Sequence, residues 1–402
     1  MQAILSNGQY PDHNVVTVPF PIPEQEYDHI LDLLRPLGIG DAVQRDCHLD
    51  ELNFGYSALT CLEGQTVNLD ELDYLAKRLE SFDKNEAAQF QATLSKLGLT
   101  DMTDIINLTF CCQQATVITD FSDLEKVGKA HFLTIQGGCA PKDELDALDG
   151  YETALMLIDS GTGVVTPYGV LYDNGMKLEQ IYDGRSFPAY YHDSYEMSMI
   201  VASADEPKRD TLLYFPCADS KIERTMQRLG VSGLADCVVV QRDTPNRPAI
   251  ATLLDFDYDW EQDLNALNQL MRCCKNFTDE KISLLNAVID EVWPQTPHEV
   301  VSLAKNFEDI AALPGITRPD LYGQHILEIE EWQNIDPALQ ECVDVQMYGD
   351  IRAKQEHGQF SSWGYVGYRG NDPVVQEVFA RWVQSEEQTE QPDQGPQMGG
   401  MA

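Results

Sequence analysis

Aspartates alternate with aromatic residues at Asp255, Asp257 and Asp259, and three carboxylates so close in sequence could hold a cation. In a calcium-binding loop beginning at Asp255, a turn glycine would occupy the sixth position and a bidentate glutamate the twelfth. Trp260 and Ala266 occupy those positions, which excludes a calcium loop of this type. If the segment is an extended strand instead, its three acids point the same way at intervals of about 6.6 Å.

Residue types found in enzyme sites are present, but not in a catalytic arrangement. The segment GTGVVT at 161–166 lacks the lysine and the third glycine of a phosphate-binding loop. His192, Asp193 and Ser194 are neighbours in sequence, whereas the members of a catalytic triad converge in space from separate elements. The eight histidines show no HExxH spacing and the ten cysteines no CxxC. We therefore predict no catalytic residue, metal or cofactor, and keep a hydrolase built from His192, Asp193 or the cysteines as an alternative.

Carboxylates do recur in rows that fit one face of a helix or strand. Asp70 and Asp73 lie one helical turn apart, a spacing that places two side chains on the same face. A run of acids is usually a solvated face, but compensating Lys and Arg are scarce beside these runs. The acids that we predict to bind a partner are Asp70, Glu71, Asp73, Asp143, Glu144, Asp146, Asp149, Asp255, Asp257, Asp259, Glu261, Asp263, Glu328, Glu330, Glu331, Asp344 and Asp350.

The whole chain is strongly acidic, with 66 Asp and Glu against 27 Lys and Arg, a formal net charge of −39 on 402 residues. The excess is spread along the chain: residues 1–175 carry a net charge of −19 and residues 197–370 carry −13. Because nucleic-acid binding relies on basic side chains, we expect a basic partner rather than DNA itself. The 39 charges equal those of about 65 Å of DNA duplex, roughly 20 base pairs, so the charge suits a protein that substitutes for DNA.

The sequence repeats itself at an offset of about 195 residues. Phe20-Pro21 recurs as Phe215-Pro216, and the leucines at 69, 72 and 75 recur at 264, 267 and 270. The stretch TDIINL at 103–108 matches HEVVSL at 298–303, and Gly128 matches Gly323. A period of this length indicates a tandem duplication rather than a solenoid. We predict a first unit at 1–175, a connecting segment at 176–196, a second unit at 197–370 and a C-terminal segment at 371–402.

The pattern of each copy predicts an α+β fold with small sheets at the ends and helices between them. Short strands open each copy, and the middle is helical, with Asn68 and Glu71 as a capping box and Thr296-Pro297 with Glu299 as a second helix start. Each copy closes in sequence read as β-rich, such as TALMLID at 153–159 and GVVTPYGVLY at 163–172. The aromatic connecting segment is expected to pack on one copy, and the tail beyond about Ser385 to be disordered.

The sequence also indicates the cellular compartment of the protein. The N-terminus has no basic segment followed by an apolar stretch, and no run of about 18 apolar residues occurs, so we expect neither a signal peptide nor a membrane span. Adjacent cysteines such as Cys111-Cys112 bridge poorly to each other, which favours reduced thiols. These features predict a cytoplasmic protein.

Two segments resemble a known family. NLDELDYLAKRL at 68–79 and PALQECVDVQMYGD at 337–350 are similar to the ArdA-type antirestriction proteins. The resemblance implies elongated, acidic α+β units that imitate bent DNA and occupy the DNA groove of type I restriction–modification enzymes. It also implies that mobile elements or phages use the protein inside a bacterial host cell. On this basis Asp344, Tyr348, Gly349 and Asp350 correspond to the family's antirestriction segment.

The chain departs from the family pattern in two ways. Thr153-Ala154-Leu155 stands in the first copy where the second has Tyr348-Gly349-Asp350, and two copies are fused in one chain. We therefore expect a pseudo-dimer within the chain, with a homodimer as the alternative. The leading hypothesis is a non-enzymatic DNA mimic directed against the methyltransferase–specificity core of a type I system. Its alternatives are a mimic that acts on another defence system such as a CRISPR complex, an acidic hydrolase, and a halophilic protein that uses acids for solubility.

Overall fold

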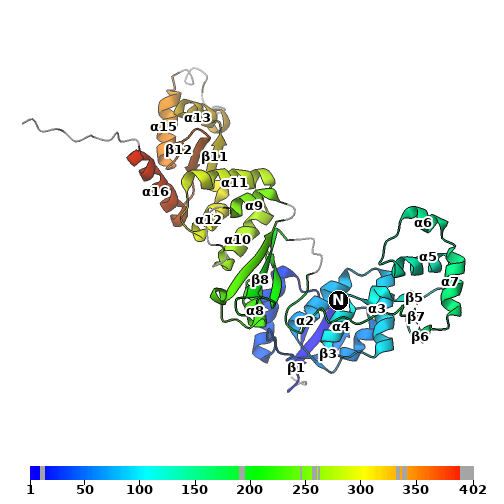
Figure 1. Cartoon of the computed structure of the whole chain (residues 1–402). Helices are drawn as coiled ribbons and strands as arrows, with labels where there is room; N and C mark the ends of the chain where they lie inside the picture. The colour runs from blue at the N-terminus through cyan, green and yellow to red at the C-terminus, as the bar shows by residue number, and fades with distance from the viewer. Residues whose placement is uncertain are drawn as a thin grey trace, which may run out of the picture. The chain divides into compact units, whose positions relative to one another are not determined.

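The computed structural model describes residues 1–9, 14–189, 195–244, 247–255, 260, 263–331, 336 and 342–389. It is a mixed α+β protein with small antiparallel sheets, as the sequence predicts. The chain divides into two compact units. Figure 1 shows the chain coloured by residue number. The first comprises residues 1–193, 199–213 and 217–241, and the second 194–198, 214–216 and 242–402. The division therefore assigns β8 (Met197–Ser203), β9 (Asp210–Phe215) and α8 (Asp219–Leu229) largely to the first unit.

The first unit opens with a four-stranded sheet in the order β2-β1-β3-β4. Strand β1 pairs antiparallel with both neighbours, Ala3 facing Val18 on one side and Leu52 on the other. Alternate residues of these strands are buried, so one face of the sheet packs on the core. The elements here are β1 (Gln2–Asn7), β2 (Val16–Pro19), η1 (Glu24–Glu26), α1 (Tyr27–Leu34), η2 (Arg35–Leu37), β3 (Cys47–Asn53), η3 (Ser57–Leu62) and β4 (Thr66–Val67).

Three helices follow: α2 (Leu69–Glu80), α3 (Lys84–Leu97) and α4 (Met102–Leu108). Asn68 caps α2 as predicted, since its side chain accepts from the backbone N–H groups of Asp70 and Glu71. Glu71 does not complete a capping box there; the full box is formed by Asp83 and Glu86 at α3. The predicted leucine stripe of α2 is buried at Leu69, Leu72, Leu75 and Leu79.

The remaining elements of residues 1–175, called the first copy after the repeat in the sequence, form a small lobe. They are η4 (Cys112–Gln114), β5 (Thr116–Ile118), α5 (Leu124–Ile135), α6 (Lys142–Ala147), α7 (Gly150–Asp159), β6 (Val164–Thr166) and β7 (Gly169–Tyr172), with a sheet in the order β5-β7-β6. The prediction of β-rich sequence is confirmed at 163–172 but wrong at 153–159, which is helical in α7. Asp149 caps that helix, accepting from Glu152 N–H at 2.9 Å.

Residues 197–370, called the second copy after the repeat in the sequence, begin with the sheet β10-β8-β9 and continue with helices and a second small sheet, β11-β13-β12. Thr296 caps α12 ahead of Pro297 as predicted, but Glu299 accepts from Gln295 N–H rather than from Thr296 N–H. The elements from residue 197 onward are β8 (Met197–Ser203), β9 (Asp210–Phe215), α8 (Asp219–Leu229), η5 (Leu234–Asp236), β10 (Cys237–Asp243), α9 (Pro248–Leu254), α10 (Leu264–Lys275), α11 (Asp279–Val292), α12 (Pro297–Lys305), η7 (Phe307–Asp309), β11 (Ile310–Pro314), α13 (Pro319–Ile326), η8 (Leu327–Glu331), α15 (Val345–Gln355), β12 (Gln359–Phe360), β13 (Gly364–Tyr368) and α16 (Pro373–Thr389).

The sequence predicts disorder for the end of the C-terminal segment and packing for the connecting segment. Helix α16 extends to Thr389, and the rest of the tail, residues 390–402, lies outside the described residues, so the expected disorder stays a prediction. The connecting segment packs on the first copy, as predicted, because Tyr182 is fully buried and Tyr74 Oη donates to Pro188 O at 2.7 Å. Tyr182 also stacks on Phe187 with ring centroids 5.2 Å apart.

Glycines let two helix pairs approach each other closely. A Cβ on Gly128 of α5 would lie 1.8 Å from Gly150 O, and a Cβ on Gly323 of α13 would lie 2.0 Å from Val345 O. These distances are far shorter than a van der Waals contact, so only glycine fits at either crossing. Both positions and both contacted carbonyls are separated by 195 residues.

We predict that Gly323→Ala and Gly128→Ala each destabilise their helix pair by about 1–3 kcal/mol, because the added methyl group forces the helices apart. Amide hydrogen exchange of α13 and α15, or of α5 and α7, measures the loss locally. Gly233→Ala is the control: no atom lies within 4 Å of its added Cβ, so its effect should stay within about 0.5 kcal/mol. Unchanged exchange in both crossing variants would contradict the close packing.

Candidate partner-binding site

Helix α8 is held against the first copy by a buried arginine. Arg224 Nη2 lies 2.9 Å from Asp70 Oδ2, and both side chains are about nine-tenths buried. Its Nη1 donates to Gly40 O at 2.7 Å, and Tyr27 Oη donates to the same Asp70 carboxylate. Burial, followed by the negative charge of Asp70, raises the Tyr27 pKa well above its ordinary value, so its proton stays in this contact.

A second arginine of α8 is bound one helical turn further on. Arg228 donates to Ala42 O and Arg185 O, both at 2.7 Å, and also to Tyr182 Oη. Tyr182 Oη in turn donates to Glu71 Oε1 at 3.0 Å. Every partner lies in the first copy or in the connecting segment, so α8 fixes both at once.

Acids of α1 and η1 complete this contact by capping α8. Ala218, the N-cap residue, has no side-chain oxygen, and its N–H donates instead to Glu24 Oε1 at 2.6 Å. Asp28 accepts from the N–H groups of Asp219 and Ser220 at 3.2 Å each. Negative groups at a helix N-terminus accept hydrogen bonds from its unpaired N–H groups and are attracted by the positive end of its dipole. The N-terminus of α8 is therefore stabilised by residues about 190 positions earlier in the chain.

The acids predicted on α2 are consequently not available to an external partner. Glu71 and Asp73 are 3% and 4% exposed. Glu71 pairs with Arg45 at 3.1 Å, and Asp73 pairs with Lys77 and accepts from Ile22 N–H, both at 2.7 Å. Asp70, Glu71 and Asp73 thus form contacts within the fold. The prediction that these three acids bind a partner as phosphate mimics is therefore wrong. Sequence alone could not reveal this because Arg224 lies 154 residues from Asp70.

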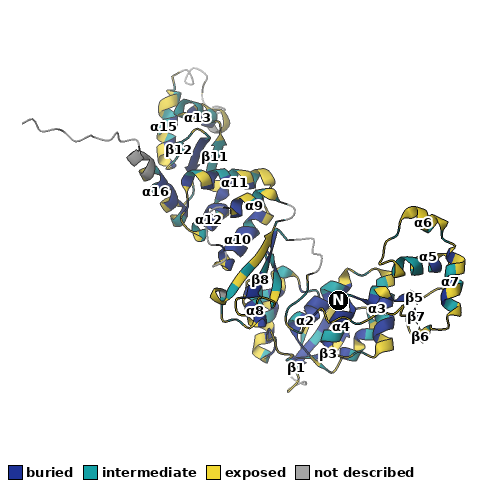
Figure 2. Ribbon diagram, viewed as in Figure 1, coloured by how far each residue is buried: buried dark blue, intermediate teal, exposed yellow. Residues whose placement is uncertain are grey.

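The acids predicted on α6 do face solvent. Asp143, Glu144 and Asp146 are exposed on this short helix, and Figure 2 shows it in the exposed colour. Asp149 is exposed as well, although its carboxylate also caps α7. No described residue forms an ion pair with any of these four carboxylates. Lys142 lies on the same helix, and the pKa of Lys129 is raised by Glu125 first and more weakly by Asp146, so the charge of these acids is compensated only in part.

The row at 255–263 is only partly described. Asp255 is the C-cap residue of α9 and has a helical conformation, with φ −79° and ψ −10°, so the condition of an extended strand is not met at this residue. Asp263 caps α10, accepting from Ala266 N–H at 2.9 Å. Asp257, Asp259 and Glu261 lie outside the described residues.

The antirestriction-like segment lies at the start of α15. Asp344 is exposed and caps the helix, accepting from Met347 N–H at 2.9 Å. Gly349 is buried where α15 crosses α13, and a Cβ there would lie 1.9 Å from Pro319 O, so this glycine is a packing residue. Tyr348 and Asp350 are half-buried. Glu328 is exposed on η8, and the side chains of Glu330 and Glu331 lie outside the described set.

A buried acid that sequence reasoning missed organises the C-terminal sheet. Glu356, 5% exposed, accepts from Tyr365 Oη at 2.8 Å, from Arg369 Nε at 3.0 Å and from Tyr322 Oη. Burial and the hydrogen bond to Glu356 raise the pKa of Tyr322 to about 12. Both hydroxyls therefore remain donors, and the cluster is structural. No local sequence signal distinguishes Glu356 from the exposed acids around it.

The thiols and histidines give no support to a nucleophilic site. Burial raises the pKa of the Cys47 and Cys112 thiols, and burial together with Cys273 raises that of Cys274 to about 12, so these groups stay protonated. Burial lowers the pKa of His131, which contacts Thr116 Oγ1 at 2.8 Å. No group of three or more His, Cys, Asp or Glu in the described ranges could hold a metal ion. His192 and Asp193 lie outside those ranges.

Comparison with known proteins adds no assignment: no protein-family model matches the chain, and no curated protein is significantly similar to it. Among the residues that the structure describes, no helix is both long and apolar enough to cross a membrane.

We predict that Arg224→Ala loosens the contact of α8 with the first copy by about 3–5 kcal/mol, because Asp70 is left as an unpaired buried charge. Amide hydrogen exchange of α8 and α2 in the full chain measures this loss.

Arg35→Ala is the matched control. Its ion pair with Asp32 is exposed on both sides, so the change should cost under about 0.5 kcal/mol. Replacing both buried partners, by Arg224→Met with Asp70→Leu, should restore much of the protection. Equal losses in the single and double variants would show that the ion pair does not hold α8 in place.

Proposed function

We propose that this chain is a non-enzymatic mimic of DNA that occupies the DNA-binding groove of a bacterial defence enzyme. The preferred target is the methyltransferase–specificity core of a type I restriction–modification system, in line with the ArdA-type resemblance. In this proposal exposed carboxylates stand in for phosphates. Sequence-specific contacts are not needed, because such an enzyme recognises the backbone through charge and shape.

The observation that carries the proposal is the exposure of acids in a chain whose net charge is −39. Asp143, Glu144 and Asp146 are exposed on α6, and no described residue forms an ion pair with them. Burial removes Glu71, Asp73 and Glu356 as well as Arg224 and Arg228, so the large negative excess of the composition remains at the surface.

We further propose that the chain is a tandem duplication of one ArdA-like unit. Supporting this, α2 and α10 have the same length at an offset of 195, as do α3 and α11. The two sheets of the first copy, β2-β1-β3 and β5-β7-β6, have counterparts in β9-β8-β10 and β11-β13-β12. The contact of α8 with α1 and α2 supports a pairing of the copies through their first parts.

The same charges give the proposal a physical mechanism. A strongly negative protein is drawn toward a basic cleft over distances of about a Debye length, 8–10 Å at ordinary ionic strength. Association should therefore be fast at low salt and weaken steeply as salt rises. A mimic acting on a CRISPR complex would behave in the same way, and only the choice of target enzyme distinguishes the two.

We predict that the purified chain competes with duplex DNA for a type I methyltransferase–specificity complex at low salt. The competition should weaken as salt rises, because the binding of oppositely charged surfaces releases counterions and this gain shrinks as the bulk salt concentration increases. Fluorescence anisotropy of labelled duplex measures the displacement. If a panel of type I complexes keeps its DNA at low salt while another defence nuclease loses it, the target assignment is wrong and the mimicry stands.

We also predict that the triple variant Asp143→Asn, Glu144→Gln and Asp146→Asn inhibits at least about tenfold more weakly at low salt, since attraction to the basic groove is reduced. The matched control removes three exposed acids elsewhere in the first unit, by Glu26→Gln, Asp32→Asn and Glu80→Gln. Equal loss in both variants would favour an even coat of acids, as in a halophilic protein, over a defined binding surface.

A further inference from the structure

Helix α11 ends at an exposed tryptophan. Trp293 directly follows the last residue of α11, and 65% of its surface is accessible to solvent, whereas Trp260 and Trp382 are buried. The hydrogen bonds that fix Trp293 use its backbone: its N–H donates to Ile289 O and its carbonyl accepts from Gln295 Nε2, both at 3.0 Å. Packing of the indole ring therefore contributes little to the fold.

The backbone of Trp293 is left-handed, with φ 48° and ψ 64°. The other described residues besides glycine with a positive φ are Asn14, Asn174 and His357, and asparagine and histidine adopt this conformation more readily than a bulky residue does. Pro294 follows, and a proline favours extended conformations in the residue before it. Trp293 is therefore held in a strained conformation, and strain of this kind is concentrated at functional sites.

The first copy has a glycine at the corresponding position. Gly98 stands 195 residues before Trp293 and ends α3 in the same left-handed conformation, with φ 61°. Its N–H donates to Leu94 O, as the Trp293 N–H donates to Ile289 O. Glycine adopts this backbone without strain and is the usual residue at such a helix end. The second copy thus carries a bulky aromatic residue where the local fold favours glycine.

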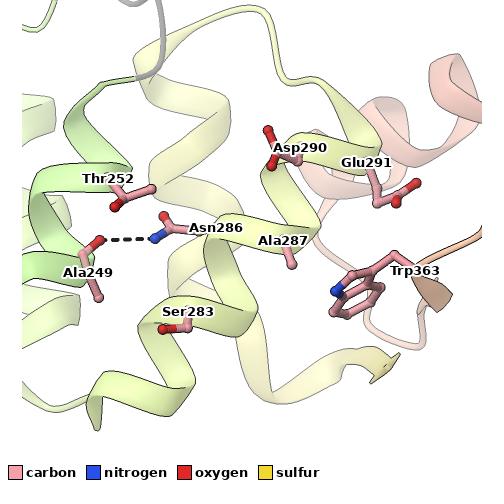
Figure 3. Close-up of a pocket in the computed structure, with 8 residues that line it drawn as sticks. All are labelled: Ala249, Thr252, Ser283, Asn286, Ala287, Asp290, Glu291 and Trp363. Carbon is pink, nitrogen blue, oxygen red and sulfur yellow. Dashed lines mark hydrogen bonds between the residues drawn. The ribbon is translucent and has the colours of Figure 1, made fainter. Parts of the chain in front are cut away.

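The last turns of α11 supply negative charge beside Trp293. Figure 3 shows these turns and a pocket of about 370 Å³ next to them, with Trp363 on one side. The carboxylates of Asp290 and Glu291 point away from each other there, and the Asn286 amide faces α9, so the polar groups of this pocket do not converge. The helix as a whole has four acids against one lysine, namely Asp279, Glu280, Asp290 and Glu291 against Lys281. Trp293 is therefore a flat aromatic group at the end of a negatively charged helix.

We propose that Trp293 imitates an extruded base and enters the base-binding pocket of a DNA methyltransferase. The proposal rests on the proposed function, since it takes a methyltransferase as the target. Such enzymes rotate the target nucleotide out of the duplex and hold its base against aromatic and apolar side chains. An indole is a flat system of two fused rings, as a purine is, and its exposure lets it enter a pocket. The acids of α11 lie beside it as phosphates lie beside an extruded base.

An apolar slot elsewhere on the same enzyme is the alternative that the test must exclude. A base pocket stacks flat rings, so it favours an aromatic side chain over an aliphatic one. An apolar slot accepts a leucine as well as a tryptophan, because hydrophobic burial has no preferred direction. Aromatic and aliphatic replacements of Trp293 therefore distinguish the two.

The first measurement separates a binding role from a structural one. Trp293→Gly in the full chain removes the strain, so its unfolding temperature should equal or exceed that of the parent chain. Gly98→Trp is the reciprocal variant and should lower the unfolding temperature, because it introduces the same strain into the first copy. A marked loss of stability in Trp293→Gly would make this residue structural and overturn the proposal.

The second measurement is the displacement of labelled duplex from a type I methyltransferase–specificity complex, followed by fluorescence anisotropy. Trp293→Gly should displace the duplex about fivefold to a hundredfold more weakly than the parent chain, as expected for the loss of one stacked aromatic group. Trp293→Phe keeps a flat ring and should lose less than Trp293→Leu. Val240→Ala is the control, since it trims an exposed apolar side chain elsewhere and should leave the displacement unchanged.

A methyltransferase variant without the aromatic side chain of its base pocket locates the contact. Toward this enzyme, Trp293→Gly should displace the duplex as well as the parent chain does, because the stacking partner is already absent. An equal loss toward both forms of the enzyme overturns the proposal, as does full displacement by Trp293→Leu.

The outcome is separable from that of the proposed function. Equal displacement by the parent chain and Trp293→Gly contradicts the imitation of a base and supports the mimicry of DNA. Failure of the parent chain to displace DNA contradicts the proposed function, and the imitation of a base with it.

Discussion

The packing of α8 depends on two buried guanidinium groups. Taking a charge out of water is costly unless attraction and hydrogen bonds replace its hydration. Arg228 meets this condition with three backbone carbonyls and with Tyr182, and Arg224 does so with Asp70 and two further carbonyls. Because these partners come from the segment between η2 and β3, from α2 and from the connecting segment, one helix links three parts of the chain. This is consistent with a first compact unit that includes residues 217–241.

Ion pairs elsewhere in the chain show how much of its negative charge is compensated. Several bases form ion pairs, including Arg45 with Glu71 and Asp101, and Arg247 with Glu196 and Asp279. Glu71 and Glu196 are largely buried, whereas Asp101 and Asp279 are exposed. Each pair neutralises one positive and one negative group and leaves the net charge unchanged. Because the chain has more than twice as many acids as bases, most of its carboxylates stay uncompensated after this pairing.

Local signals in the sequence predicted local structure well. The cap at Asn68, the cap and proline at Thr296 and Pro297, and the leucine stripe of α2 all depend on residues within a few positions of each other. The error at 153–159 arose because a short apolar run fits a buried strand as well as a helix. Asp149, which caps α7, was the signal that could have decided it.

The candidate site was harder to predict because burial of an acid depends on partners remote in sequence. Nothing near Glu71 distinguishes it from Glu144, yet one binds Arg45 and Tyr182 while the other faces solvent. The charge of a row is therefore visible in the sequence, but its exposure is not. For the same reason the pocket beside Trp363 could not be anticipated, since its walls come from separate elements.

The second copy indicates why the acids of α2 carry a structural role. At the offset of 195 residues, Asn265, Ala266 and Asn268 of α10 replace Asp70, Glu71 and Asp73. Asn268 and Ala266 are buried, as Asp73 and Glu71 are, so the positions keep their burial while losing their charge. A buried carboxylate needs a nearby cation, and these three acids have one each: Arg224 of α8 for Asp70, Arg45 for Glu71 and Lys77 for Asp73. The neutral side chains of α10 need no such cation.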